Sequence, residues 1–281
     1  MNGIELKGVT KWYKKNCALD NANIVFEKDK IYGLLGRNGA GKSTMLNLIS
    51  NRIFPTSGEI YVDGEKSIEN DKALGKIYCM SENNLLPRSF KVKDAINTTK
   101  YFYPNFDEEY AFKLAESYEL DTKKKLQSLS TGYNSISKII LALASNADYI
   151  FFDEPVLGLD ANHREIFYKQ LIEKYSRDGG TFIISTHLIE ECANLIEKAV
   201  IIKEGKIIEN RDIDDLLSCS YTITGSSENV DRYCTGKQVI GSDQIGGLKS
   251  AYIMGRPENV PEGLEVSKAS LQNLFIQMTN K

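Results

Sequence analysis

The chain has 281 residues, of which 42% are hydrophobic and 26% charged, a composition typical of a folded globular protein and not of a disordered one. Its 35 basic and 38 acidic side chains give a net charge of −3, so nucleic acid is excluded as the main partner. The apolar runs are far shorter than the roughly 20 residues of a membrane helix, and the first residues lack the pattern of an export signal. We therefore expect a cytoplasmic protein that does not cross a bilayer by itself.

The first 50 residues predict β structure followed by a loop and a helix. Short β-prone segments at residues 4–6 and 23–26 favour an antiparallel opening. Residues 31–35 form an apolar run that stops at a glycine-rich loop, and residues 43–49 continue with helical spacing.

The middle of the chain predicts a helical insert followed by a parallel sheet. Amphipathic patterns between residues about 85 and 145 indicate a helical subdomain. Residues 149–152 and 181–184 have the apolar character of buried parallel strands, and a helical pattern at 162–175 separates them. We predict an α/β core with a mixed sheet.

The end of the chain predicts two further units. A hairpin around Glu204 and Gly205 and a short helix would close a first domain at residues 1–217. Residues 218–281 alternate short strand-like pieces with turns and end in a helical pattern at 270–279, which predicts a small accessory α+β domain. We expect this domain to take no part in hydrolysis. It either regulates or braces the dimer, or it is a passive cap.

One motif binds phosphate. The sequence G-x-x-x-x-G-K-[ST] lies between a predicted strand and a predicted helix, as a phosphate-binding loop requires. Backbone N–H groups of such a loop surround the phosphates, Lys42 would reach the β- and γ-phosphates, and Ser43 would ligate Mg²⁺. The candidate nucleotide-binding residues are Gly36, Asn38, Gly39, Ala40, Gly41, Lys42, Ser43 and Thr44.

Two acids follow the apolar strand at residues 149–152. Parallel strands bring such residues to the carboxyl edge of the sheet, next to the phosphate loop. We assign Asp153 to hold Mg²⁺, directly or through water, and Glu154 to orient or deprotonate the attacking water. With Lys42, these residues predict magnesium-dependent hydrolysis of a nucleotide.

Together these residues resemble the ATP-binding cassette (ABC) ATPases, the nucleotide-binding subunits of ABC transporters, over roughly the first three-quarters of the chain. The resemblance implies a P-loop α/β fold with an antiparallel N-terminal β subdomain and a helical subdomain, and it implies ATP and Mg²⁺ as cofactors. The family signature Leu-Ser-Gly-Gly-Gln corresponds to residues 129–133, Leu-Ser-Thr-Gly-Tyr, where two of five residues depart. Ser130 and Gly132, which would contact a γ-phosphate across a dimer, are retained. In isolation, Ser130 would be only a helix N-cap.

The resemblance extends to single residues. Asp160, in Gly-Leu-Asp, corresponds to the D-loop, and His187 stands at the position of the switch histidine after the next strand. Tyr13 corresponds to the aromatic residue that stacks on adenine. His163, in a polar helical pattern, is expected to be a surface residue.

The glutamine of the family Q-loop is missing. Alignment from the preceding strand places Glu82 there, whereas counting back from Pro87 places Ser81. We prefer Glu82, because a carboxylate can approach Mg²⁺ and water, and assign it to both nucleotide and metal binding.

Within the family, residues 101–107, 126–133 and 269–275 resemble ATPase subunits of bacterial ABC-2-like exporters linked to GntR-type regulators. This implies a separate integral-membrane permease as partner and a place on the inner face of the cell membrane. It also implies a dimer, formed from two copies or with another ABC ATPase. A tandem-cassette translation factor would need a second phosphate loop, and a structural-maintenance ATPase would need sustained heptads. A soluble ABC ATPase outside transport is the alternative.

Overall fold

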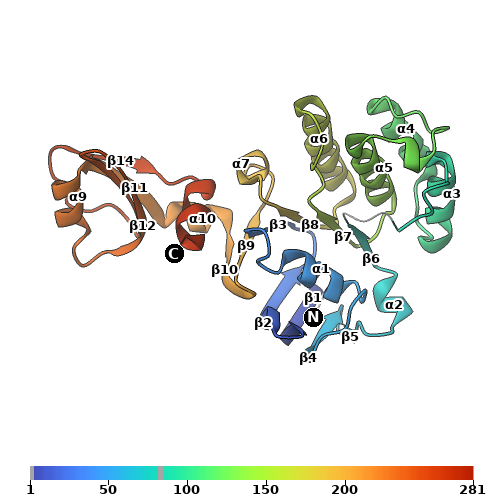
Figure 1. The fold of residues 1–281 in the computed structure, drawn as a ribbon, viewed down its shortest axis with the longest axis horizontal. Helices are drawn as coiled ribbons and strands as arrows, with labels where there is room; N and C mark the ends of the chain where they lie inside the picture. Colours follow the sequence, from blue (N-terminus) through green and yellow to red (C-terminus); the bar gives the residue numbers. More distant parts are fainter. Residues whose placement is uncertain (1–2, 82–84, 281) are drawn as a thin grey trace.

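The computed structural model describes residues 3–81 and 85–280 and contains three β-sheets in two connected parts (Figure 1). The larger part holds two sheets and the helices around them, and the smaller part holds the third sheet near the C-terminus.

The first sheet is antiparallel, as predicted, with the strand order β2-β1-β4-β5. Its first two strands pair Ile4 with Phe26 and Leu6 with Ile24, so alternate apolar side chains point into one core. The strands are β1 (Gly3–Tyr13), β2 (Asn16–Glu27), β4 (Ser57–Val62) and β5 (Glu65–Lys66).

The central sheet has the order β10-β9-β3-β8-β7-β6 and is parallel except for β10. Every residue of β3, β7 and β8 is buried, which explains their continuous apolar sequences and confirms the predicted buried strands. The predicted hairpin is also confirmed, as β9 and β10. The strands are β3 (Ile31–Gly36), β6 (Ile77–Met80), β7 (Tyr149–Asp153), β8 (Thr181–Thr186), β9 (Lys198–Lys203) and β10 (Lys206–Asp212).

Helices cover this sheet, and the predicted helical insert is confirmed (Figure 1). Asp107 and Ser130 begin two of its helices by accepting hydrogen bonds from the backbone N–H groups of Tyr110 and Tyr133. Within the described residues, no helix combines the length and apolar character needed to span a membrane. The helices of the larger part are α1 (Lys42–Ile49), α2 (Asp71–Leu74), α3 (Val92–Phe102), α4 (Glu108–Ser117), α5 (Thr131–Ala144), α6 (Ala161–Asp178), α7 (Ile189–Cys192) and α8 (Ile213–Ser218), with a 3-10 turn at Leu126–Ser128.

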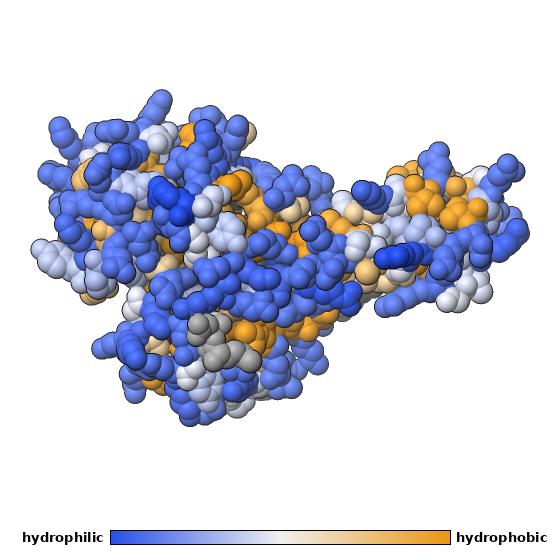
Figure 2. Space-filling model, turned by 180° about the vertical axis from the view of Figure 1, so that it is seen from behind, coloured by the Kyte–Doolittle hydropathy of each residue, from blue (hydrophilic) through white to orange (hydrophobic). Residues whose placement is uncertain are grey.

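The third sheet has the order β12-β13-β11-β14 and carries α9 on one face. The sequence patterns predicted pieces of three of these strands but neither β14 nor α9, whose Val230 and Tyr233 complete a small separate core. Its outer surface includes the exposed apolar residues Ile245 and Leu248, and Figure 2 shows hydrophobic residues gathered on this part. The elements are β11 (Ser220–Ser226), α9 (Ser227–Cys234), β12 (Gln238–Ile245), β13 (Leu248–Met254) and β14 (Leu264–Lys268).

The last helix, α10 (Leu271–Thr279), returns to the larger part of the protein. Its side chains Leu271, Leu274 and Phe275 are buried in the same core as residues of β3, β9 and α7. Figure 1 shows this helix between the C-terminal sheet and the central sheet. The division at residue 217 stays a prediction, because α10 packs both on the large core and on β12 of the third sheet, where Gln277 donates to Asp243 over 2.8 Å.

Candidate nucleotide-binding site

The phosphate loop connects β3 to α1 at the carboxyl edge of the central sheet. Gly39 and Gly41 have φ angles of 81° and 113°, which side chains rarely allow. A Cβ on Gly41 would lie 2.4 Å from the carbonyl oxygen of Ala18 on β2. Glycine is therefore required at position 41 for both conformation and space.

The loop is held from two sides. The N–H of Gly205, in the turn between β9 and β10, donates to the carbonyl of Ala40 over 2.9 Å. The carbonyl of Gly205 in turn accepts from the N–H of Asp20 on β2 over 2.9 Å. The sequence motif could not reveal the contact with Gly205, because this residue lies far later in the chain than Ala40.

Lys42 is buried, with 6% of its surface exposed, and its ammonium group lies under the loop. Nζ donates to the carbonyl of Gly36 over 2.7 Å and lies 3.7 Å from the carboxylate of Glu154. Burial lowers the pKa of Lys42, against the opposing attraction of Glu154 and Asp153. The predicted lysine and the predicted acid pair are thus brought together.

Asp153 ends β7 and is 8% exposed. Its Oδ1 accepts a hydrogen bond of 3.0 Å from the hydroxyl of Ser185, its register partner on β8. Ser185 is a site residue that sequence reasoning missed, although a serine next to the end of a buried strand is a usable signal. This bond orients the carboxylate.

Glu154 has a φ of 50°, a left-handed conformation that is rare for residues with a side chain. Its N–H donates to the carbonyl of Ser185 over 2.9 Å, which anchors the unusual backbone turn. Its Oε2 lies 2.9 Å from Nδ1 of His187 at the end of β8. The carboxylate therefore lies between an ammonium group and an imidazole.

Lys42, Glu154 and His187 line one cavity of about 520 Å³, whereas Asp153 is not among its described lining residues. Tyr13, with 46% of its surface exposed, lines its outer end together with Asn16 and Ala18. The sequence analysis did not identify Asn16 or Ala18, since nothing local distinguishes them. The cavity is lined by Tyr13, Asn16, Ala18, Arg37, Asn38, Gly39, Ala40, Gly41, Lys42, Ser43, Thr44, Glu154, Leu157 and His187.

Ser130 and Gly132 are placed elsewhere. Neither belongs to the described residues that line the cavity, and Ser130 is exposed at the start of α5. A Cβ on Gly132 would lie 2.6 Å from the carbonyl oxygen of Gly158, so the signature segment packs closely on the D-loop. The two departures from the family signature leave this contact in place.

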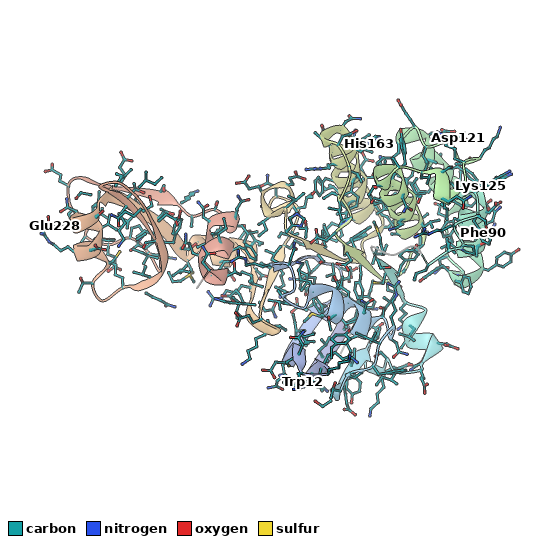
Figure 3. The ribbon with its side chains drawn as sticks, viewed as in Figure 1. Trp12, Phe90, Asp121, Lys125, His163 and Glu228 are labelled. Carbon is teal, nitrogen blue, oxygen red and sulfur yellow. The ribbon has the colours of Figure 1, made fainter. Side chains whose placement is uncertain are left out.

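Asp160 caps α6, and its side chain is bonded to His163. One carboxylate oxygen accepts a hydrogen bond of 2.9 Å from the backbone N–H of His163, and the other lies 3.1 Å from Nδ1 of its ring. The His163 ring also contacts the rings of Tyr118 and Tyr133. The expectation of a surface histidine holds only in part: neighbouring aromatic rings cover part of His163, and 18% of its side chain is exposed. Figure 3 shows His163 among the helices, away from Trp12 on β1.

Glu82 lies outside the described residues. Ser81 follows β6, and its carbonyl accepts a hydrogen bond of 3.2 Å from Lys138 on α5. The choice between Glu82 and Ser81 for the Q-loop position stays a prediction.

The donor set at the carboxyl edge fits Mg²⁺. Mg²⁺ prefers hard oxygen ligands and keeps several of its waters. The hydroxyl of Ser43 lines the cavity, and the buried carboxylate of Asp153 is held at the adjacent strand end. These two oxygen ligands would leave the remaining positions to phosphate and water.

Comparison with known proteins identifies the family of the chain. Residues 19–157 match the family described as ABC transporter. The ABC transporter ATP-binding protein YtrB of Bacillus subtilis is 31% identical over 213 residues, covering 76% of this chain and 73% of YtrB. The petrobactin import ATP-binding protein YclP of the same organism is 29% identical, covering 77% of this chain and 90% of YclP. The chain belongs to the family of ABC transporter ATP-binding proteins.

Solved structures show the same cassette. The dimeric post-hydrolysis structure of the ATP-binding cassette MJ0796, bound to ADP and Pi, superimposes with a TM-score of 0.66 at 28% identity. The match covers 75% of this chain and 98% of that cassette, so the rest of this chain has no counterpart there. This protein is an ABC ATPase that binds and hydrolyses ATP.

Proposed function

We propose that the protein is the ATPase subunit of an exporter, acting on the cytoplasmic face of the membrane through a separate permease. Export is supported by the resemblance of residues 101–107, 126–133 and 269–275 to ABC-2-like exporters linked to GntR-type regulators. A relative named for petrobactin import shows that related cassettes also serve uptake.

The chemistry follows from the residues around the cavity. Lys42 binds the β- and γ-phosphates, and Ser43 and Asp153 hold Mg²⁺, which when bound neutralises phosphate charge. Glu154 accepts a proton from water as the water oxygen bonds to the γ-phosphorus and the bond to the ADP oxygen breaks. His187 orients the Glu154 carboxylate, 2.9 Å away, and lines the same cavity, so it would sense the γ-phosphate. The products are ADP and inorganic phosphate.

Two chains would complete each site. Ser130 and Gly132 lie outside the cavity lined by Lys42 and Glu154, so a second subunit must present its own signature segment to the γ-phosphate. Asp160, at the start of α6, would lie at this interface. The dimeric MJ0796 cassette supports the arrangement.

The observation that carries the transport proposal is an exposed aromatic pair at the end of α3. Tyr101 and Phe102 are 89% and 71% exposed, whereas α3 buries Val92, Ala95 and Ile96 on its other side. Large exposed apolar side chains mark interaction surfaces. A helix of the permease would cover this pair.

The test is to co-express the chain with the membrane proteins encoded beside it and to measure nucleotide-dependent transport in inside-out vesicles. Tyr101→Asp should abolish complex formation and transport while leaving the ATPase activity of the isolated subunit unchanged. Glu109→Gln, at an exposed position on α4, is the matched control. Failure of the unaltered chain to associate with any such membrane protein would favour a soluble ABC ATPase outside transport.

A further inference from the structure

The end of the chain reaches the phosphate loop. Oδ1 of Asn280, directly after α10, accepts a hydrogen bond of 3.4 Å from Nη1 of Arg37, the first variable residue of the loop. A cavity of about 420 Å³ separates the two segments and is lined by residues 37–40, 202–204 and Thr279. The last helix and the nucleotide site thus share a boundary.

Lys203 makes the stronger link. This residue ends β9, and its Nζ donates to the carbonyls of Met278 and Asn280 over 3.3 Å and 3.0 Å. These carbonyls are at the C-terminus of α10, where the helix dipole is negative and a cation is stabilising. Lys203 therefore holds the end of α10 electrostatically as well as by hydrogen bonds.

The same strand end also holds the phosphate loop. Two residues beyond Lys203, the N–H of Gly205 donates to the carbonyl of Ala40. The turn between β9 and β10 thus touches α10 on one side and the loop on the other. If α10 were displaced, Lys203 and Arg37 would lose their hydrogen bonds to the end of this helix. The phosphate loop would then lose support at Arg37 directly and at Ala40 through the turn.

The packing of α10 adds apolar contacts to this link. Leu271, Leu274 and Phe275 are buried against the core that contains β3, the strand leading into the loop. The chain thus leaves the ATPase part after α8, forms the third sheet and returns to place its last helix beside the nucleotide site.

We propose that Lys203 and the end of α10 form a positioning device for the phosphate loop, so that nucleotide affinity depends on the docking of α10. The C-terminal segment would then take no part in hydrolysis, as expected, but would regulate nucleotide binding through this coupling. Because coupling free energies are reciprocal, bound nucleotide must also strengthen the docking of α10.

The first experiment measures the Kd for ADP by calorimetry in full-length variants. Lys203→Met should raise it at least about fivefold and raise KM for ATP with little change in kcat, whereas Lys203→Arg should restore most of the affinity. Lys206→Met is the matched control: it removes the same charge from the same hairpin, and Lys206 forms its ion pair with Asp20 on β2, over 3.3 Å, and not with α10. Folded Lys203→Met protein that binds ADP as tightly as the unaltered chain would overturn the proposal.

Two further measurements apply even if Lys203→Met fails to fold. Asn280→Ala removes the contact to Arg37 without changing charge and should weaken ADP binding about twofold. In the unaltered chain, hydrogen exchange of the amides of α10 should slow when ADP is added. Equal exchange with and without ADP would show that the helix and the site are uncoupled.

Discussion

Glu154 and His187 directly follow the neighbouring strands β7 and β8, and meet with 2.9 Å between Oε2 and Nδ1. Lys42 approaches the other carboxylate oxygen to 3.7 Å. The acid that would receive the proton of water is thus oriented by groups that surround it, and its left-handed backbone fixes where it points.

Glu154→Gln should lower kcat by about 100-fold or more, because the amide cannot accept the proton of water. ATP binding should persist, since the phosphate loop and Lys42 are unchanged, and light scattering should detect an ATP-trapped dimer. Glu165→Gln, at an exposed position on α6, is the control. Unimpaired turnover of Glu154→Gln would show that Glu154 is not the catalytic base.

Ser185→Ala should raise the Mg²⁺ concentration for half-maximal activity roughly tenfold. The substitution removes the hydrogen bond to Asp153, and a bond to a charged group is worth about 1.5 kcal/mol or more. Ser185→Thr, which keeps a hydroxyl, tests whether the bond and not the residue matters. A Mg²⁺ titration that is the same for Ser185→Ala and the unaltered protein would contradict a role for this pair in metal binding.

Tyr13→Ala should raise the Kd for ATP at least about threefold, worth about 0.65 kcal/mol, because the ring lines the outer end of the cavity. Tyr13→Phe keeps the ring and should bind normally. GTP should compete with ATP, since stacking does not distinguish the base edges. A smaller change in Tyr13→Ala would argue that the ring does not stack.

Gly132→Ala should abolish turnover while leaving nucleotide binding to the isolated chain intact. A Cβ at this position would lie 2.6 Å from the carbonyl of Gly158 and would push the signature segment away from the D-loop. Mixing this variant with an inactive Lys42→Ala chain should restore part of the activity, because one of the two sites in a mixed dimer is then complete. If mixtures stay inactive although mixed dimers form, the sites are not shared between chains.

Leu274→Ala should lower the free energy of unfolding by about 2–5 kcal/mol, because this side chain of α10 is fully buried in the large core. Urea unfolding can be followed by the fluorescence of Trp12, the one tryptophan of the chain. Trp12 lies on β1, far from the third sheet (Figure 3), so an early loss of its signal would show that α10 stabilises the ATPase part. A midpoint equal to that of the unaltered chain would place α10 outside this cooperative unit.

The phosphate loop, Asp153 and Glu154 could be predicted because each depends on a local pattern: a strand, a turn and the residues that follow. Ser185 could not be assigned in the same way, because its role depends on the register between β7 and β8. The environment of His163 depends on aromatic rings from α5 and from the end of α4.

The C-terminal region also shows that a local sequence pattern does not predict long-range packing. The helical pattern at residues 270–279 is confirmed as α10, yet the pattern alone does not say which core covers its apolar face. The structure places it against residues of β3, β9 and α7, about 70 to 240 residues earlier in the chain.

The hydrogen bond from Gly205 to Ala40 has a consequence for biosynthesis. The phosphate loop lies early in the chain, but β8, β9 and the turn that hold it are translated more than a hundred residues later. A nascent chain that stops before Gly205 has the nucleotide-binding motif without its supports. Most of the chain must therefore be synthesised before bound ATP can favour folding of the nucleotide site. Until then the apolar segment of β3 is exposed, and chaperones can bind it.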